Sequence, residues 1–134
     1  IKDGYALQHA VKCGLEIAII TGGKSQAVRT RYEGLGIQHV FLGTSVKLIK
    51  YNEWLTENNL THDEVLYMGD DIPDYEVMQQ CGCACCPADA ATEIKQIATY
   101  ISPIKGGHGC VRDVIEQVLR AQGKWMTNAE AFGW

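Results

Sequence analysis

Three carboxylates stand close together in the segment GDDIPD, which directly follows the apolar run VLYM. Asp70, Asp71 and Asp74 would repel one another at this spacing unless a cation lay among them. Oxygen ligands with no neighbouring histidine or thiolate favour a hard ion, and magnesium is the first choice. A turn followed by a helix cap would explain one of these residues, since Asp is common in both places, but explains three less well. The segment therefore predicts a Mg²⁺ site.

Two other segments have residues suited to binding an anion. Thr21 ends the apolar run EIAII and precedes Gly22 and Gly23, which let the backbone approach an anion, and a helix that Ser25 caps follows them. Lys47 stands near the start of another predicted helix, where the helix dipole disfavours a cation, so its ammonium is a candidate partner for a bound anion. Each signal is weak alone, because glycine turns and surface lysines are common.

Segments with helical apolar spacing alternate with short continuous apolar runs. This alternation predicts right-handed crossovers and a parallel sheet covered on both faces, so we expect an α/β, doubly wound parallel sheet, in one domain over 1–134. Within 45–58, Val46, Ile49 and Leu55 are expected to face the core. The predicted helices span 3–13, 25–35, 45–58, 73–81, 89–98 and 110–122, and the strands span 16–20, 39–42, 65–69, 83–86 and 99–102.

The loops that follow the strands select one edge of this sheet as the binding site. In doubly wound sheets, ligands bind beyond the carboxyl ends of the strands, near the point where strand order reverses. Thr21 and Asp70 both follow predicted strands directly. We therefore expect Thr21, Lys47 and Asp70 to converge at one edge of the sheet.

Charge and hydropathy narrow the class of partner. The net charge of −4 and the pI near 5.5 argue against nucleic acid, which usually binds a basic face. No apolar run approaches the roughly 20 residues that span a bilayer. We expect a small-molecule partner, and neither nucleic acid nor membrane.

Four of the six cysteines crowd into CGCACC, a spacing too tight for disulfides between neighbours. Unpaired cysteines in a chain with an adequate apolar core indicate a reducing compartment, so a cytoplasmic location is expected. A zinc site is the alternative, because zinc prefers thiolates. However, no second CxxC or HxxxH cluster would complete a tetrahedron, so we interpret these cysteines as small buried strand residues.

The strand-end Thr, the Lys and the GDDxxD segment together resemble the second, third and fourth motifs of the haloacid dehalogenase-like phosphatases. Four segments narrow the resemblance to the 3-deoxy-D-manno-octulosonate-8-phosphate phosphatases, a subgroup without a large cap domain: KDGYALQHAVKCGLEIAIITGG, GTSVKL, YMGDDIPDYEVM and GGHGCVRDVIEQVLRAQGKW. The likeness is collinear from Ile1 to about Trp125. It implies Mg²⁺-dependent hydrolysis of an eight-carbon sugar-acid phosphate in lipopolysaccharide precursor synthesis.

The resemblance also implies roles for particular residues. Thr21 would donate a hydrogen bond to the transferring phosphoryl group beside Gly22, and Lys47 would neutralise the oxygens of that group and of an aspartyl-phosphate intermediate. Asp70 would bind Mg²⁺, and two further carboxylates would support that loop: Asp71 and Asp74.

The same resemblance implies that Lys2, Asp3, Gly4 and Arg31 face the sugar acid. Arginine is more usual in the subgroup at four positions, which weakens the expected sugar contacts: Lys2, Gln8, Gly23 and His108.

The residue that should attack phosphorus is not found. In the superfamily, the nucleophile is the first Asp of a DxD that ends the central strand, and no DxD follows an apolar strand in this sequence. We therefore expect the chain to be N-terminally incomplete and inactive alone. Without the central strand, 16–20 and 65–69 should not be adjacent and should expose unpaired edges.

Two other functions remain open. A phosphatase for a nine-carbon sialic-acid-type 9-phosphate would share these motifs, and a non-catalytic phosphatase-like domain kept for binding would retain the fold. The subgroup resemblance also implies a homotetramer, in which neighbouring subunits cover each exposed site. The aromatic-rich tail over 124–134 is expected to pack on a neighbour, with folding back on its own subunit as the alternative.

Overall fold

The predicted order of helices and strands is confirmed by the computed structural model, which describes residues 2–127 and 129–133. The helices are α1 (Lys2–Lys12), α2 (Gln26–Gly34), α3 (Lys47–Glu57), α4 (Tyr75–Gln80), α5 (Thr92–Ile97) and α6 (Cys110–Ala121). The strands are β1 (Ala18–Ile20), β2 (His39–Phe41), β3 (Leu66–Met68), β4 (Cys83–Cys86) and β5 (Tyr100–Ile101). Short 3-10 turns occupy His62–Glu64, Ile72–Asp74 and Ala129–Phe132.

Local residue chemistry explains where α2 begins and ends. The Ser25 side chain accepts a hydrogen bond from the backbone N–H of Ala27, which caps the start of the helix as the sequence predicts. The chain leaves the helix at Gly36, whose φ of +90° is a conformation that a residue with a Cβ rarely adopts. This turn leads the chain directly into β2.

All observed strand pairs are parallel, but the strands of the described residues form two separate sheets. β1 pairs with β2, and β3, β4 and β5 form the second sheet in that order. β1 and β3 do not pair with each other, so each has one edge without a hydrogen-bonded strand among the described residues. The expectation that these two strands would not be adjacent is confirmed.

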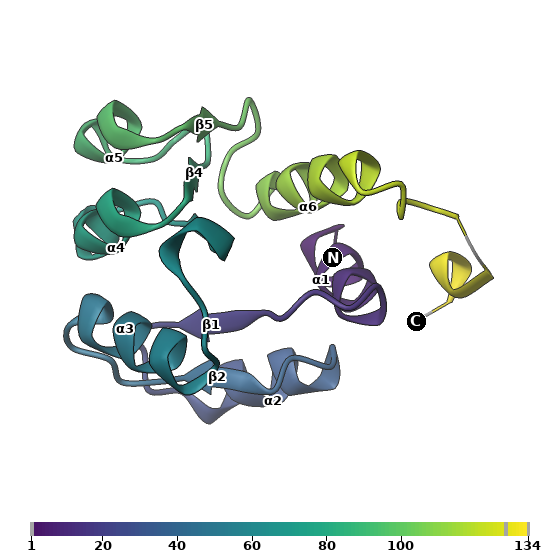
Figure 1. Ribbon diagram of the computed structural model, residues 1–134, viewed down its shortest axis with the longest axis horizontal. Coiled ribbons are helices and arrows are strands. Elements are labelled where there is room, and N and C mark those ends of the chain that lie inside the picture. Colours follow the sequence, from purple (N-terminus) through teal and green to yellow (C-terminus); the bar gives the residue numbers. More distant parts are fainter. Residues whose placement is uncertain (1, 128, 134) are drawn as a thin grey trace.

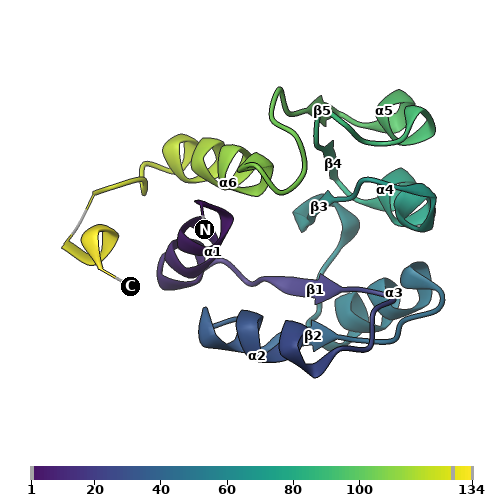
Figure 2. The same cartoon turned by 180° about the vertical axis from the view of Figure 1, so that it is seen from behind.

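Helices cover both faces of the strands. Figures 1 and 2 show α1, α2 and α6 on one side and α3, α4 and α5 on the other, with the strands between them. α1 and α6 lie side by side although they come from opposite ends of the chain. This is the two-sided covering that parallel crossovers produce. None of the described helices is long and apolar enough to cross a membrane.

The side chains in and next to α3 that face the protein core differ from the prediction. Leu55 is buried as expected, next to Tyr51 and Trp54, but Val46 and Ile49 are exposed, Ile49 to 59%. At about 100° per residue, Ile49 lies roughly 120° around the helix from Leu55. Because the buried stripe follows Tyr51 and Leu55, the prediction that Val46 and Ile49 face inward is wrong.

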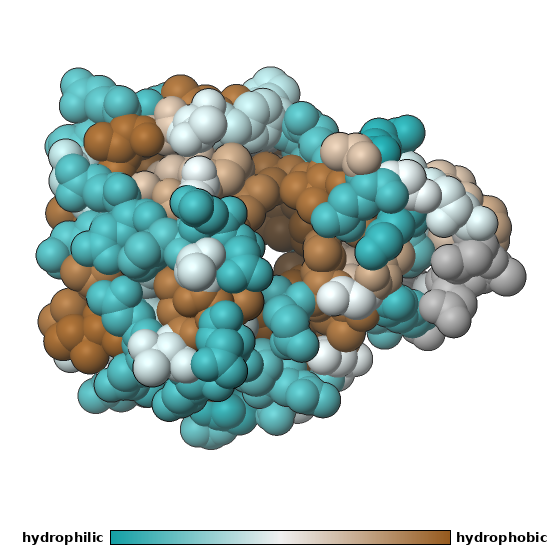
Figure 3. Space-filling model, viewed as in Figure 1, coloured by the Kyte–Doolittle hydropathy of each residue, from teal (hydrophilic) through white to brown (hydrophobic). Residues whose placement is uncertain are grey.

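β1 and β3 are less buried than their continuous apolar sequences predict. The residues of β1 are only half-buried, and Leu66 of β3 is exposed. Each strand has a neighbour on one side only, so its apolar side chains are covered incompletely. Figure 3 shows a hollow near the middle of the molecule with hydrophobic residues around it.

Asp113 of α6 ties this helix to β5 and to the residue after it. One oxygen, Oδ2, accepts hydrogen bonds from the hydroxyls of Tyr100 and Ser102, both at 2.7 Å, and Oδ1 accepts one from Gln117 at 3.0 Å. Burial alone would raise the pKa of Asp113, but these hydrogen bonds outweigh it and hold the pKa below its usual value. The ionised carboxylate therefore stabilises the fold.

We expect Asp113→Asn to lower the free energy of unfolding at pH 7 by about 1–2 kcal/mol, because the hydrogen bonds to the charged group are lost. The pKa is lower in the folded state, so this stabilisation is present above the unfolded value of about 3.9 and disappears as the pH falls through the folded value. Urea unfolding at pH 7 and below pH 4 measures both effects. Asp63→Asn, at an exposed position, is the control. Equal stability of Asp113→Asn and the unsubstituted chain at pH 7 would contradict this role.

Candidate functional site

Asp74 is the most buried acidic group in the loop that follows β3, with an exposed fraction of 3%. Its Oδ1 accepts hydrogen bonds from Lys47 Nζ at 2.8 Å and from the Tyr67 hydroxyl at 2.6 Å. Its Oδ2 accepts hydrogen bonds from the backbone N–H groups of Asp70 at 3.0 Å and Asp71 at 3.3 Å. This carboxylate therefore fixes both the loop and the lysine.

The charge of Asp74 is stabilised by these donors. Burial would raise its pKa, but the hydrogen bonds from Lys47 and Tyr67 and the charge of Lys47 lower the pKa below its usual value. Asp74 and Lys47 thus form a largely buried ion pair that joins α3 to the loop after β3. Asp74 therefore supports the loop of Asp70, and its role beside a metal ion stays a prediction.

Asp70 is in a different environment from Asp74. Its carboxylate is exposed and has no hydrogen bond or ion pair to any other described residue. Desolvation raises its pKa, and the neighbouring charges of Asp74 and Asp71 raise it further, against the opposing effect of Lys47. A cation at this position would relieve that repulsion, and an oxygen donor suits Mg²⁺. The residue therefore fits the predicted role as a metal ligand.

Asp70 alone would not make a complete metal site. Within the described part of the chain, no group of three or more His, Cys, Asp or Glu residues is placed to hold a metal ion. The side chain of Asp71 is engaged in its own turn, where its Oδ1 accepts a hydrogen bond from Ile72 N–H at 2.8 Å. Because Mg²⁺ takes a near-octahedral set of oxygens, its other ligands must come from water, from substrate or from other carboxylates.

The Thr21 loop and the segment before Lys47 are joined by backbone hydrogen bonds. Thr44 N–H donates to Thr21 O at 3.0 Å, and Gly43 N–H donates to Gly23 O at 2.8 Å. The Thr21 Oγ1 accepts a hydrogen bond from Gly23 N–H at 3.1 Å, which leaves its hydroxyl proton available to a ligand. The structure thus links Thr21 through one loop to Lys47, and Lys47 through Asp74 to the loop of Asp70.

The predicted sugar-facing residues lie apart from this chain of contacts. Asp3 accepts a hydrogen bond from Arg112 N–H at 3.0 Å at the start of α6, and Lys2 lies beside Gly109. Gly4 is buried at the start of α1. Arg31 is exposed on α2, with its guanidinium over the Tyr32 ring. No hydrogen bond or ion pair between described residues connects these positions to Lys47 or Asp74.

Two further loops are joined to the Asp70 loop by hydrogen bonds: the loop after β4, which was not singled out from the sequence, and the glycine-rich loop before α6, which was. Ala91 N–H donates to Asp70 O at 2.9 Å, and Gly106 N–H donates to Asp89 Oδ1 at 2.8 Å. The Asp70 loop is therefore held by the loop after β4, which in turn holds the glycine-rich loop before α6. Tyr67 was also missed, because a tyrosine within an apolar strand indicates packing before it indicates a hydrogen bond.

The prediction that the clustered cysteines are buried strand residues is confirmed for Cys85 and Cys86 but not for Cys81, which is half-buried and lies before β4. Cys85 and Cys86 are buried, and Cys83 is half-buried in the same strand. Burial raises the pKa of Cys85 to about 12, and the adjacent Cys83 adds to this shift. The Cys85 thiol therefore stays protonated at neutral pH, so it is a poor metal ligand and nucleophile.

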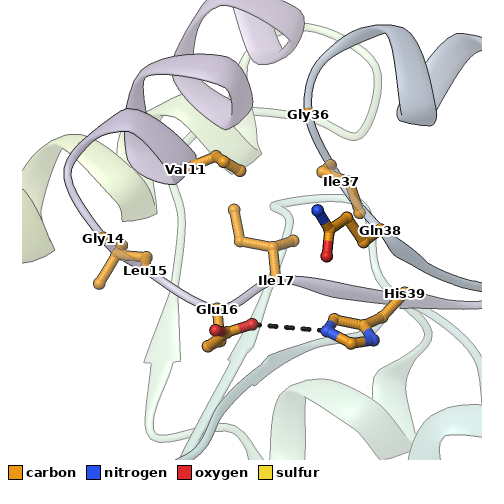
Figure 4. Close-up of a pocket in the computed structure, with 9 residues that line it drawn as sticks. All are labelled: Val11, Gly14, Leu15, Glu16, Ile17, Gly36, Ile37, Gln38 and His39. Atoms are coloured by element: carbon orange, nitrogen blue, oxygen red, sulfur yellow. Dashed lines mark ion pairs between the residues drawn. The ribbon is translucent and has the colours of Figure 1, made fainter.

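A shallow pocket lies at the opposite ends of β1 and β2, where these strands begin. Figure 4 shows its apolar walls, including Val11, Ile17 and Ile37, and an ion pair at its rim between Glu16 and His39, whose atoms are 3.4 Å apart. Parallel sheets bind ligands at the carboxyl ends of their strands, so this pocket is distinct from the candidate site.

Comparisons with known proteins identify the family of this chain. The family model described as haloacid dehalogenase-like hydrolase matches residues 4–88. Since a parallel α/β fold, a strand-end Thr and a Lys–Asp pair at one edge accompany that match, the chain belongs to the haloacid dehalogenase-like hydrolases.

Relatives place the chain more narrowly. It is 40% identical to the 3-deoxy-D-manno-octulosonate 8-phosphate phosphatase of Escherichia coli K12 over 92% of its own length. The crystal structure of the enzyme from Yersinia pestis matches with a TM-score of 0.89 and 38% identity, over 92% of this chain and 66% of that one. The structure from Moraxella catarrhalis, in complex with a magnesium ion, a phosphate ion and KDO, matches with a TM-score of 0.88 and 32% identity, over 91% of this chain and 70% of that one. The chain therefore belongs to the 3-deoxy-D-manno-octulosonate 8-phosphate phosphatase family. It spans 66% of the length of the curated relatives it matches.

Gly69 gives the site a direct test, because it leaves room for the Asp74 side chain. A Cβ added at Gly69 would lie 2.6 Å from Asp74 Cγ, so Gly69→Ala must displace that carboxylate. We expect a loss of about 1–3 kcal/mol in the free energy of unfolding, as for other overpacked positions. Gly34→Ala is the control, since nothing lies within 4 Å of the added atom and α2 should keep or gain up to about 1 kcal/mol. Urea unfolding measures both, and equal effects would show that Gly69 has no special role.

Proposed function

We propose that the protein to which this chain belongs is a Mg²⁺-dependent phosphatase that removes phosphate from 3-deoxy-D-manno-octulosonate 8-phosphate in lipopolysaccharide precursor synthesis. The observation that carries this proposal is the placement of Lys47. Asp74 holds its ammonium beside the Asp70 loop, and the segment before it is bonded to the Thr21 loop. The Moraxella catarrhalis relative was solved with magnesium, phosphate and KDO, which supports the same ligand classes here.

Each residue at this edge has a chemical task in the proposal. Thr21 donates its free hydroxyl proton to a phosphoryl oxygen, with Gly22 allowing the backbone to come close. Lys47 keeps two N–H groups beyond the one that it gives to Asp74, and these neutralise phosphoryl oxygens. Asp70 is the ligand for Mg²⁺, which when bound supplies charge stabilisation to the phosphoryl oxygens. Asp71 shapes the turn that carries Asp70.

The sugar acid would lie toward the starts of α1 and α6. Lys2, Gly4 and Arg31 are the proposed contacts to it, and Asp3 acts mainly by fixing the start of α6 through Arg112 N–H. The hydrogen bond that Asp3 Oδ1 accepts from the backbone N–H of Arg112 supports this division.

The carboxylate that attacks phosphorus is proposed to come from polypeptide outside the 134 residues. A parallel strand between β1 and β3 would pair with both unpaired edges and would end at the same edge as Thr21 and Asp70. An aspartate at its carboxyl end would complete the site as nucleophile.

Phosphate release from two substrates, by the 134-residue chain and by a longer protein, tests this function. The 134-residue chain should release no phosphate, whereas a protein that also includes the nucleophile strand should hydrolyse the eight-carbon substrate faster than a nine-carbon sialic-acid-type 9-phosphate. In that protein, we expect Asp70→Asn to lower the Mg²⁺-dependent rate by at least about 100-fold, since metal sites depend on each ligand. Phosphate release measures the rates, and Asp63→Asn is the matched control. No hydrolysis of either substrate by the folded protein would favour a binding domain instead.

A cytoplasmic homotetramer that binds neither nucleic acid nor membrane is the proposed state of the whole protein. Part of the tail packs on its own chain, which is the alternative to packing on a neighbour. Trp125 is 9% exposed and packs on its own chain, against the rings of Tyr5 and His9. Phe132, in contrast, is 75% exposed and remains a candidate contact with a neighbour. Trp134, the other tail tryptophan, lies outside the described residues.

Light scattering tests the assembly. We expect a tetrameric mass for the protein that includes the nucleophile strand, and a smaller mass for Phe132→Ser if the tail contributes to the interface, because interface cores favour aromatic residues. Truncation after Gly123 also removes Trp125 from the core, so it should lower stability as well. A monomeric mass for the unsubstituted protein would refute the assembly.

A further inference from the structure

The Asp74 carboxylate has a full set of hydrogen-bond donors. Lys47 Nζ and the Tyr67 hydroxyl share Oδ1, at 2.8 and 2.6 Å, and the N–H groups of Asp70 and Asp71 share Oδ2. An ionised carboxylate offers about four lone-pair positions, so no place is left for a further donor. Each donor is therefore confined to one position around the group.

Tyr67 is held firmly in the position from which it donates. It comes from β3, and its ring lies edge-on to the ring of Tyr51, with centroids 6.4 Å apart and an interplanar angle of 89°. The ring also packs against the apolar clusters around Val77 and Ile94. Burial and the bond to Asp74 raise the pKa of Tyr67, so the hydroxyl keeps its proton and remains a donor.

We propose that Tyr67 is a positioning residue for Lys47: by occupying one of the two lone-pair positions of Asp74 Oδ1, it restricts the Lys47 ammonium to the other. The ammonium then has a single direction of approach to Asp74, and its two remaining N–H groups have a fixed direction. The proposal rests on the proposed role of Lys47 as the cation that meets the phosphoryl oxygens. Loss of the hydroxyl would open a second position on Oδ1 and let the ammonium move between the two.

The test uses Tyr67→Phe, which keeps the ring and removes only the hydroxyl. The 134-residue chain, labelled with ¹⁵N at lysine, should show a slowly exchanging ammonium signal for Lys47, because this group is largely buried and paired. Lys47→Met assigns that signal. We expect it to be lost in Tyr67→Phe.

Tyr100→Phe is the matched control, because it removes the hydroxyl from another tyrosine–carboxylate hydrogen bond, to Asp113 at 2.7 Å. Loss of the Lys47 signal in Tyr67→Phe alone supports the proposal. Its retention in both variants, or its loss in both, overturns it. If Tyr67→Phe does not fold, the unsubstituted chain provides the test. Its Tyr67 hydroxyl proton should exchange slowly with water, and the absence of a slowly exchanging proton overturns the proposal. These measurements need no turnover, so they are independent of whether the protein is a phosphatase.

Discussion

The buried ionised carboxylate of Asp74 is the constraint on which the rest of the site depends. A charge taken out of water is costly unless it is paired and hydrogen-bonded, and Asp74 is both. To meet that requirement, the chain brings a lysine from α3, a tyrosine from β3 and two backbone N–H groups to one point. The loop that carries Asp70 and the direction of Lys47 follow from this arrangement, and so does the need for glycine at position 69.

This constraint also joins the two sheets. Lys47 belongs to the helix that follows β2, whereas Asp74 follows β3 in the other sheet. An apolar cluster between α3 and α4 contains Tyr51 and Trp54 from α3 and Val77 from α4. The two sheets share no backbone ladder among the described residues, so their relative position depends on side chains and loops. The candidate site lies across this junction, which couples the geometry of the site to the packing below it.

Much of the fold could be predicted from the sequence because its signals are local. Apolar runs, the Ser25 cap and the Gly36 turn each depend on a few neighbouring residues, and the structure contains all of them. Whether Val46 and Ile49 face the core could not be predicted, since that depends on which side of α3 packs against α4. The acidic residues of the site were recognised by their spacing. Tyr67 was not, because its partner Asp74 becomes visible only when the loop after β3 turns back over the strand.

The order of strands also determines how the molecule opens locally. Among the described residues, β4 alone has a ladder on both sides, while β1 and β3 each rely on one. Breaking the structure around β4 requires the loss of two ladders together, whereas the outer strands can separate singly. β2 and β5 also have one ladder each, so all four outer strands should separate more readily than β4. A strand paired with β1 and β3, as proposed above, would give each of them a second ladder and would reduce local opening next to Thr21 and Asp70.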